Sequence, residues 1–165
     1  MLRVMDAGAW LGAGDLDVQR FRALSRTVDV RYSRDDGALQ SLMTSLQNVS
    51  GIYCLETGAR VLRLGLSNAG IGKRLMHHLK ESYGDQPSRT RQWPDYYEFH
   101  RRLIGRPLVI RYLGCPREHT ARIEAGLLRE LGDRVLWQQL KRDERRNGTA
   151  DWDAVTRLFE GPPER

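Results

Sequence analysis

The stretch from residue 51 to residue 79 reads GIYCLETGARVLRLGLSNAGIGKRLMHHL, and it decides the fold. Residues 51–55 form a short apolar run of β-forming residues, and residues 60–66 alternate between polar and apolar side chains. The Thr57-Gly58 pair between them is typical of a turn, so the two runs predict a β-hairpin. After a short loop, apolar residues recur at helical spacing and predict a helix over residues 71–81.

Side chains suited to catalysis lie along this hairpin and helix. Tyr53 falls near the centre of the predicted sheet, and the second strand ends at Gly65, where the missing side chain lets a backbone or a ligand approach. Arg74 and His78 share one helix face at a spacing of i and i+4, and Glu124 lies on a later helix. Phosphodiester hydrolysis needs an activated water, a stabiliser for the charge on the phosphoryl oxygens and help for the leaving oxygen, and these residue types supply them.

The flanking sequence predicts further elements around this centre. Helices are expected at residues 15–24, 36–47, 96–104, 118–131 and 151–159, strands at 28–32 and 107–113, a polar loop at 84–94, a strand or helix end at 135–140 and a solvated loop at 141–147. The predicted fold is α+β, with a small central antiparallel or mixed β-sheet of about three strands flanked by helices. Residues 1–47 are expected to form a mostly helical N-terminal extension that packs on the domain of residues 48–165 or supports a homodimer.

The composition favours a soluble protein that binds polyanions. The chain has 165 residues, of which 40% are hydrophobic, with a formal net charge of +6 and a pI of about 9.7. A basic balance favours nucleic acid first and an anionic membrane surface second. Cys54 and Cys115 lie far apart without CxxC spacing, which argues against a zinc site or a disulfide framework and favours the reduced cytoplasm. No run reaches the roughly 18 apolar residues of a membrane span, and no secretory signal is visible, so no membrane association is expected.

The hairpin and helix resemble the GIY-YIG nuclease family. The first signature of that family stands intact at Gly51-Ile52-Tyr53, and the second falls on Arg63-Leu64-Gly65, where only the glycine matches. The catalytic arginine of the family falls on Arg74, after the basic Lys73, and the histidine that many members carry one turn later falls on His78. The metal-binding glutamate falls on a downstream helix, so the resemblance reaches well beyond the hairpin.

The resemblance assigns that glutamate to Glu124 and covers about residues 49–147. It implies a GIY-YIG-like fold and a metal-dependent endonuclease that hydrolyses phosphodiester bonds in nucleic acid, with DNA favoured over RNA. In this interpretation Glu124 holds Mg²⁺ or Mn²⁺ and Arg74 stabilises charge on the scissile phosphate. Tyr53 or His78 then positions or deprotonates the attacking water.

The departure in the second signature leaves two alternatives open. The family places a tyrosine near the attacking water, and Arg63 cannot act as a base because its guanidinium stays protonated. One alternative is a catalytically degenerate nucleic-acid-binding module. The other is a protein-interaction domain whose charged face is only solvated, which predicts no affinity for nucleic acid even at low salt.

Further basic and aromatic residues are candidates for substrate contacts. The candidate substrate-binding residues are Arg63, Gly65, Ser67, Lys73, His77 and Arg91. A second cluster combines cations that fix phosphates with aromatic rings that stack on unpaired bases, and it contains Arg89, Arg91, Arg101, Arg102, Trp93, Tyr96 and Tyr97. His100 and His119 lack a matching partner in the sequence and are interpreted as structural or surface residues.

Overall fold

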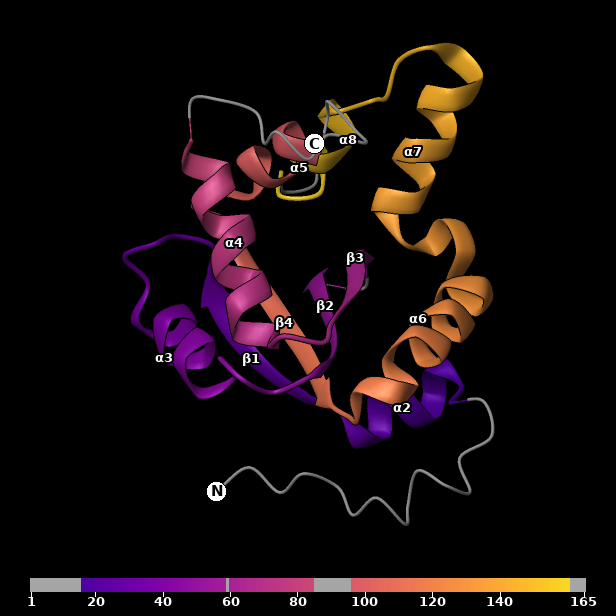
Figure 1. Ribbon diagram of the computed structural model, residues 1–165. Helices are drawn as coiled ribbons and strands as arrows, with labels where there is room; N and C mark the ends of the chain where they lie inside the picture. Colours follow the sequence, from indigo (N-terminus) through magenta and orange to yellow (C-terminus); the bar gives the residue numbers. More distant parts are fainter. Residues whose placement is uncertain (1–15, 59, 85–95, 161–165) are drawn as a thin grey trace.

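The computed structural model describes residues 16–58, 60–84 and 96–160. At its centre lies a four-stranded antiparallel sheet with the strand order β1-β4-β2-β3 (Figure 1). The strands are β1 (Arg26–Arg31), β2 (Gly51–Thr57), β3 (Arg60–Ser67) and β4 (Pro107–Gly114). The expected α+β class and the β2–β3 hairpin are therefore confirmed.

The expectation of about three strands was wrong, because the sheet has four. The additional strand is β1, which pairs with β4 from Arg26 opposite Tyr112 to Arg31 opposite Pro107. The alternation of residues 28–32 predicted a strand, but nothing in the local sequence told which strand it would join. The N-terminal part of the chain thus adds a strand to the same sheet as the hairpin.

Helices cover both faces of this sheet (Figure 1). On one side lie α3 and α4, and on the other lie α6 and α7. The helical elements are α2 (Val18–Leu24), α3 (Gly37–Ser45), α4 (Ile71–Tyr83), α5 (Tyr96–Leu103), α6 (Arg117–Leu131), the 3₁₀ turn η1 (Gly132–Arg134), α7 (Leu136–Asn147) and α8 (Asp153–Arg157). Because helices pack on β2 from both sides, residues 51–55 are buried without alternation.

Two aspartates begin the N-terminal helices. The Asp36 carboxylate accepts a hydrogen bond from the backbone N–H of Leu39 at 2.9 Å, and Asp17 accepts one from Arg20 at 2.7 Å. Each carboxylate satisfies a backbone donor that the first helical turn leaves without a partner. The cap of α2 is therefore Asp17, and the expected helix at residues 15–24 begins at Val18 within the described residues.

The expected solvated loop at residues 141–147 is instead the second half of α7. Leu136, Trp137 and Leu140 recur at helical spacing and are buried, so the charged residues that follow continue an amphipathic helix. Just before this helix, Val135 forms a parallel bridge with Val61 of β3. The apolar stripe and this bridge fix α7 beside the outer strand of the sheet.

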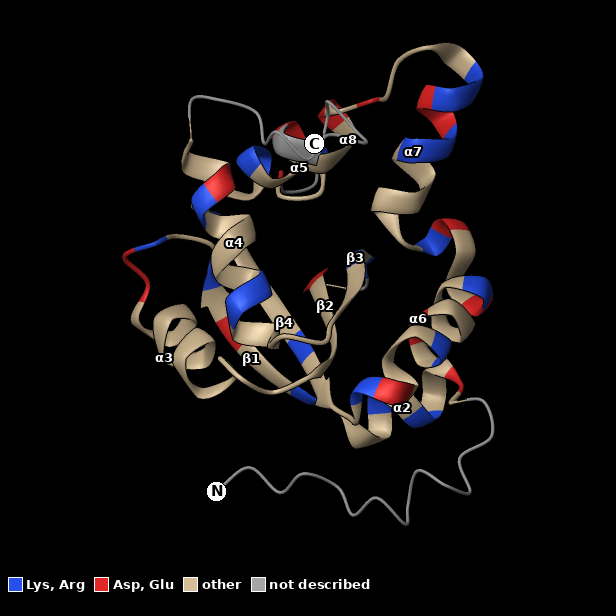
Figure 2. Cartoon of the chain, viewed as in Figure 1, with Lys and Arg blue, Asp and Glu red and all other residues tan. Residues whose placement is uncertain are grey.

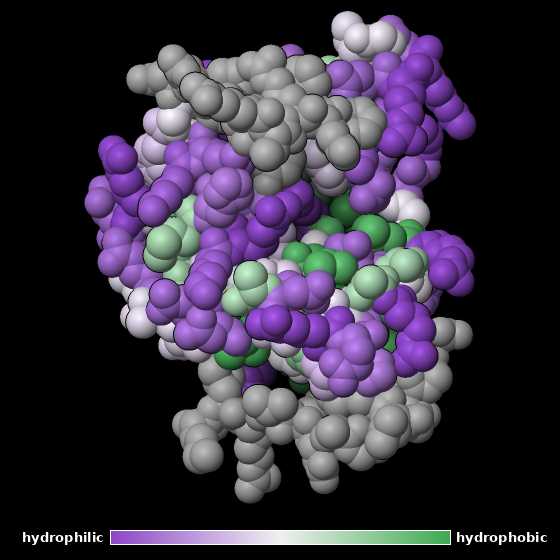
Figure 3. All heavy atoms as spheres, in the orientation of Figure 1, coloured by the Kyte–Doolittle hydropathy of each residue, from purple (hydrophilic) through white to green (hydrophobic). Residues whose placement is uncertain are grey.

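One face of the described part is largely hydrophilic (Figure 3). Figure 3 shows polar and charged residues over most of one face, with small apolar patches near its middle. Met76 and Leu158 are the large hydrophobic residues of the described segments that count as exposed. Among the helices in those segments, none has both the length and the apolar character needed to cross a membrane.

Candidate active site

One pocket of about 710 Å³ gathers most of the predicted site residues. It follows β3, the outer strand of the sheet, and is bounded by the N-terminal half of α4 and by α6 and α7. Figure 2 shows basic residues near the start of α4 and along α7, on the two sides of β3. The predicted residues in the pocket wall are Tyr53, Arg63, Gly65, Ser67, Lys73, Arg74, His77 and Glu124.

Tyr53 and Gly65 are partners across the hairpin. A β-carbon at position 65 would lie only 2.6 Å from the Tyr53 hydroxyl oxygen and 2.8 Å from Cζ of the same ring. No real side chain tolerates such contacts, so the glycine makes room for the phenol. Gly65 therefore has a definite role, because it allows the Tyr53 ring to lie over the second strand.

The Tyr53 hydroxyl lies 2.7 Å from Nε2 of His78 on α4. Both residues are buried, and His78 is outside the pocket wall, so it reaches the pocket through the tyrosine. Burial, followed by the neighbouring His100 and Arg63, holds the pKa of His78 well below its ordinary value. A neutral imidazole can accept a hydrogen bond from the phenol, so the pair is suited to orienting Tyr53.

Arg63, one of the predicted substrate-binding residues, is buried, with 8% exposure. Its Nη1 donates to Nε2 of His100 at 2.6 Å, and its guanidinium carbon lies 5.3 Å from the Trp137 ring centroid. The His100 ring in turn stacks on His78, with centroids 4.5 Å apart. Arg63 is thus anchored from behind while it lines the pocket.

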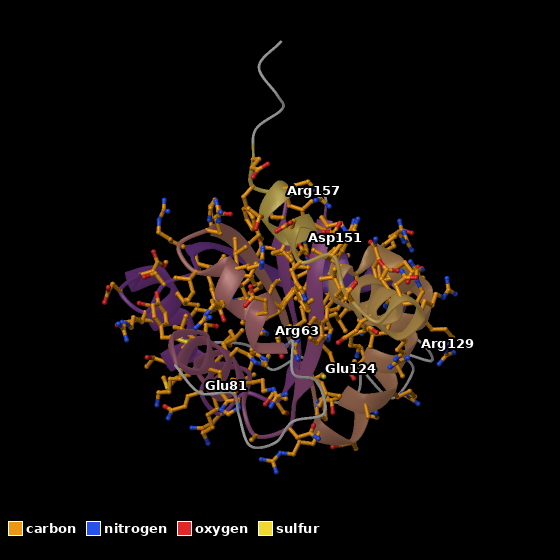
Figure 4. All side chains as sticks on the ribbon, turned by 90° about the horizontal axis from the view of Figure 1, so that it is seen from above. Arg63, Glu81, Glu124, Arg129, Asp151 and Arg157 are labelled. Atoms are coloured by element: carbon orange, nitrogen blue, oxygen red, sulfur yellow. The ribbon has the colours of Figure 1, made fainter. Side chains whose placement is uncertain are left out.

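Glu124 is the carboxylate of the pocket and comes from α6. Burial raises its pKa, against the opposing effects of Arg63, a backbone hydrogen bond from Leu66, Arg74 and Lys141. Figure 4 shows the labelled Arg63 and Glu124 close together near the centre of the view, whereas Arg129, Asp151 and Arg157 lie toward the periphery. The phosphate of a nucleic acid would be drawn to the cations of this pocket, whereas the half-buried Glu124 carboxylate would repel it unless a cation lay between them.

Within residues 16–58, 60–84 and 96–160, no group of three or more His, Cys, Asp or Glu side chains is arranged to hold a metal ion. A divalent ion at Glu124 would therefore need oxygen ligands from water or from a substrate phosphate, which is the usual situation for Mg²⁺.

Two of the predicted substrate-binding residues, Ser67 and His77, interact with residues close to them in the sequence. The Ser67 hydroxyl donates to the Gly70 carbonyl at 2.8 Å and accepts from the Gly70 N–H at 3.1 Å, which closes the turn before α4. His77 lies 3.1 Å from a carboxylate oxygen of Glu81 on the same helix. Both residues line the pocket, but Ser67 shapes its loop and His77 is also held by Glu81 of its own helix.

The second predicted basic cluster does not join this pocket within the described residues. Arg102 pairs with Glu98 at 2.9 Å and with Asp153 at 3.0 Å, which links α5 to α8. Arg101 is exposed on α5. The predictions for Arg89, Arg91 and Trp93 fall outside the described residues, as do those for the side chains of Tyr96 and Tyr97.

Sequence reasoning missed residues that only the tertiary structure brings to the site. Trp137, Gln138 and Lys141 line the pocket from α7, and Lys141 lies 5.7 Å from the Trp137 ring centroid. The i and i+4 spacing of Trp137 and Lys141 could have placed them on one helix face. His100 was interpreted as lacking a partner, yet it is fully buried and bonded to Arg63.

Comparison with known proteins adds no assignment. No protein-family model, no curated protein and no solved structure matches the chain. What the chain does must therefore be inferred from the pocket itself and from the sequence pattern that brings its residues together.

Proposed function

We propose that this chain is a metal-dependent endonuclease of the GIY-YIG type, which hydrolyses phosphodiester bonds in nucleic acid, with DNA favoured over RNA. The observation that carries the proposal is the Tyr53–His78 hydrogen bond of 2.7 Å, set against Gly65 in a pocket that also contains Arg74 and Glu124. These five positions are the ones that the resemblance singled out.

The charge of the pocket supports an anionic substrate. Among the described residues, four cationic side chains line the pocket together with one carboxylate, that of Glu124; the cations are Arg63, Lys73, Arg74 and Lys141. Cations that converge from three elements bind a phosphodiester backbone through charge and charge-assisted hydrogen bonds. Arg74, exposed on the first turn of α4, is the proposed ligand of the scissile phosphate.

The geometry also suggests how Tyr53 and His78 divide their work. Tyr53 belongs to the pocket wall, whereas His78 lies behind it and is unfavourably placed to become an imidazolium because it is buried near Arg63 and Arg74. We therefore assign Tyr53 to positioning the attacking water and His78 to accepting the phenol hydrogen bond, which holds the ring in its orientation.

Glu124 is the proposed metal ligand, and its surroundings fit a loosely held ion. Mg²⁺ commonly binds through one or two carboxylates together with water and substrate phosphates. When bound, Mg²⁺ or Mn²⁺ supplies a Lewis acid that polarises the phosphoryl oxygens. The neighbouring cations oppose a resident divalent ion, so the ion should bind with nucleic acid and not before it.

One observation favours the alternative of a nucleic-acid-binding module without cleavage. The second-signature tyrosine is replaced by Arg63, and a lone carboxylate among four cations is a sparse metal site. The same pocket would then bind phosphates and leave them intact. Cleavage and binding must therefore be measured side by side.

The test compares site variants with matched surface variants. Glu124→Gln and Arg74→Ala should each lower the cleavage rate by at least about 100-fold, as removal of one electrostatic stabiliser commonly does. Glu124→Gln should still bind substrate. Glu118→Gln and Arg129→Ala, which change the same charges at exposed positions of α6, should cleave like the wild type.

Each result has a definite meaning. If the wild-type protein binds but does not cleave, the binding-module alternative replaces the nuclease. If Glu124→Gln cleaves as fast as Glu118→Gln, Glu124 is not the metal ligand. If the protein does not bind nucleic acid even at low salt, both proposals fail.

A further inference from the structure

A chain of buried hydrogen bonds runs behind the pocket, from Arg63 to the backbone of α4. Arg63 Nη1 lies 2.6 Å from His100 Nε2, and His100 Nδ1 lies 3.2 Å from the Tyr32 hydroxyl. That hydroxyl lies 3.3 Å from Ser82 Oγ, which is 2.7 Å from the His78 carbonyl oxygen. Arg63 belongs to β3, His100 to α5 and Ser82 to α4, and Tyr32 directly follows β1. This series of hydrogen bonds therefore ties together segments that are distant in the sequence.

The two ends of this series of hydrogen bonds, the Arg63 guanidinium and the His78 carbonyl, fix the direction of every hydrogen bond in it. A carbonyl only accepts, so Ser82 donates to His78 and must accept from Tyr32. The Tyr32 oxygen then accepts from His100 Nδ1–H. At the other end, Arg63 only donates, so His100 Nε2 must accept. Both ends require the same neutral tautomer of His100, with its proton on Nδ1.

The surroundings of His100 agree with this tautomer. Its ring is fully buried, and burial, followed by the charges of Arg63, Arg74 and His77, holds its pKa well below the ordinary value. A protonated ring would place an N–H against the guanidinium of Arg63. A neutral imidazole instead gives that guanidinium an acceptor.

A neutral anchor has a consequence for the pocket. A carboxylate at this position would cancel the charge of Arg63, whereas a neutral imidazole adds no opposing charge, so Arg63 acts as a cation on the pocket and on the Glu124 carboxylate there. The bond also restrains a long side chain whose rotamer freedom would otherwise oppose binding. Trp137 packs beside the same guanidinium, with its ring centroid 5.3 Å from the guanidinium carbon.

We propose that His100 is the positioning residue for Arg63, and that together with Tyr32 and Ser82 it holds this arginine as a cation that binds a phosphate of the nucleic acid. The inference rests on the proposed function, since it takes the pocket as a nucleic-acid site. It does not require cleavage, because a phosphate contact contributes to binding whether or not the phosphodiester bond is cut.

The test therefore measures binding, without metal, of a fluorescent DNA oligonucleotide to the full chain over a range of salt concentrations. Arg63→Met should weaken binding by about tenfold. It should also make the slope of log affinity against log salt shallower by about the amount that the loss of one phosphate contact causes. His100→Leu, which removes the acceptor, should do the same. His100→Gln, whose side-chain oxygen can replace Nε2, should bind within about twofold of the wild type.

The double variant separates positioning from a purely structural role. Because His100 is proposed to act through Arg63, Arg63→Met with His100→Leu should bind no more weakly than Arg63→Met alone. Additive losses, or a wild-type salt slope in His100→Leu, would overturn the proposal. An unchanged affinity of Arg63→Met would overturn it as well.

A further variant covers the case in which His100→Leu does not fold. Tyr32→Phe keeps the ring but removes the oxygen that accepts from His100 Nδ1–H. It should weaken binding and lower the salt slope in the same direction as Arg63→Met, and wild-type binding by this variant would contradict the proposal. Because none of these measurements needs turnover, failure of the nuclease proposal and failure of this one give different results.

Discussion

The hydroxyl of Tyr53 on β2 and Nε2 of His78 on α4 lie 2.7 Å apart, in a buried contact between the sheet and the helix that follows the hairpin. Gly65 leaves the space in which the phenol lies, because a β-carbon there would lie 2.6 Å from its oxygen. The contact thus depends on three positions that are distributed over the hairpin and the helix. It holds the tyrosine in the wall of the pocket that also contains Glu124.

Tyr53→Phe should abolish most of the activity while the protein still folds. The change removes the hydroxyl proposed to position the water, and we expect the cleavage rate to fall by about 100-fold or more. It also leaves the buried His78 nitrogen without this partner, which should lower the free energy of unfolding by about 1–3 kcal/mol. Tyr112→Phe, on the adjacent strand and outside the pocket wall, is the matched control. A Tyr53→Phe variant that cleaves at the rate of Tyr112→Phe would refute the role of the hydroxyl.

Gly65→Ala should disturb the same contact from the other strand. The added methyl group would meet the Tyr53 ring, which must move away from His78, and such overpacking commonly costs about 1–3 kcal/mol. We expect a lower midpoint in chemical denaturation and a loss of cleavage. Gly126→Ala is the control, because no neighbouring atom lies within 4 Å of the new carbon and alanine favours the helix by about 1 kcal/mol. Equal stability of the two variants would show that the space at position 65 is not needed.

The free energy of unfolding should decrease at acidic pH. The pKa of His100 is held well below 6.5 by burial first and then by Arg63, Arg74 and His77, and that of His78 is lowered too. Below pH 6.5 the unfolded chain binds protons that the folded chain does not. Each of the two histidines therefore contributes a stability that is complete above this pH and is lost as the pH falls, by at most about 1.4 kcal/mol per pH unit.

Chemical denaturation at pH 7.5 and pH 5.5 checks this expectation, with His100→Gln as the comparison. Groups that titrate in both proteins cancel, so the difference between the two pH dependences isolates His100. We expect the wild type to lose more stability than the variant over this interval. Equal losses would mean that His100 is not buried as a neutral ring.

Local patterns predicted the parts of the fold whose partners are close in sequence. The hairpin follows from its turn at Thr57-Gly58, and α4 follows from the apolar spacing after residue 70. The pairing of β1 with β4 joins residues far apart in the chain, so periodicity indicated the strand but not its place. The charge run after Leu140 resembled a loop because the buried stripe that makes α7 amphipathic is short.

The residues of the candidate site also include some that the sequence indicated and some that only the tertiary structure brings there. Tyr53, Arg74 and Glu124 were singled out through the resemblance to a nuclease family, and all three line one pocket. His100 was not found, because its partner Arg63 is on a different element and no sequence spacing relates them. Lys141 was missed for the same reason, since it enters the pocket only through the packing of α7 against β3.

The most direct test of the central claim is cleavage by the wild-type protein. Labelled single-stranded and duplex DNA and RNA would be incubated with the protein in Mg²⁺, in Mn²⁺ and in excess chelator, and the products separated by size. The account predicts shorter products with at least one metal, DNA cut faster than RNA, and intact substrate with chelator. Intact substrates in both metals, from protein that binds them, would contradict the claim of catalysis and leave a nucleic-acid-binding module.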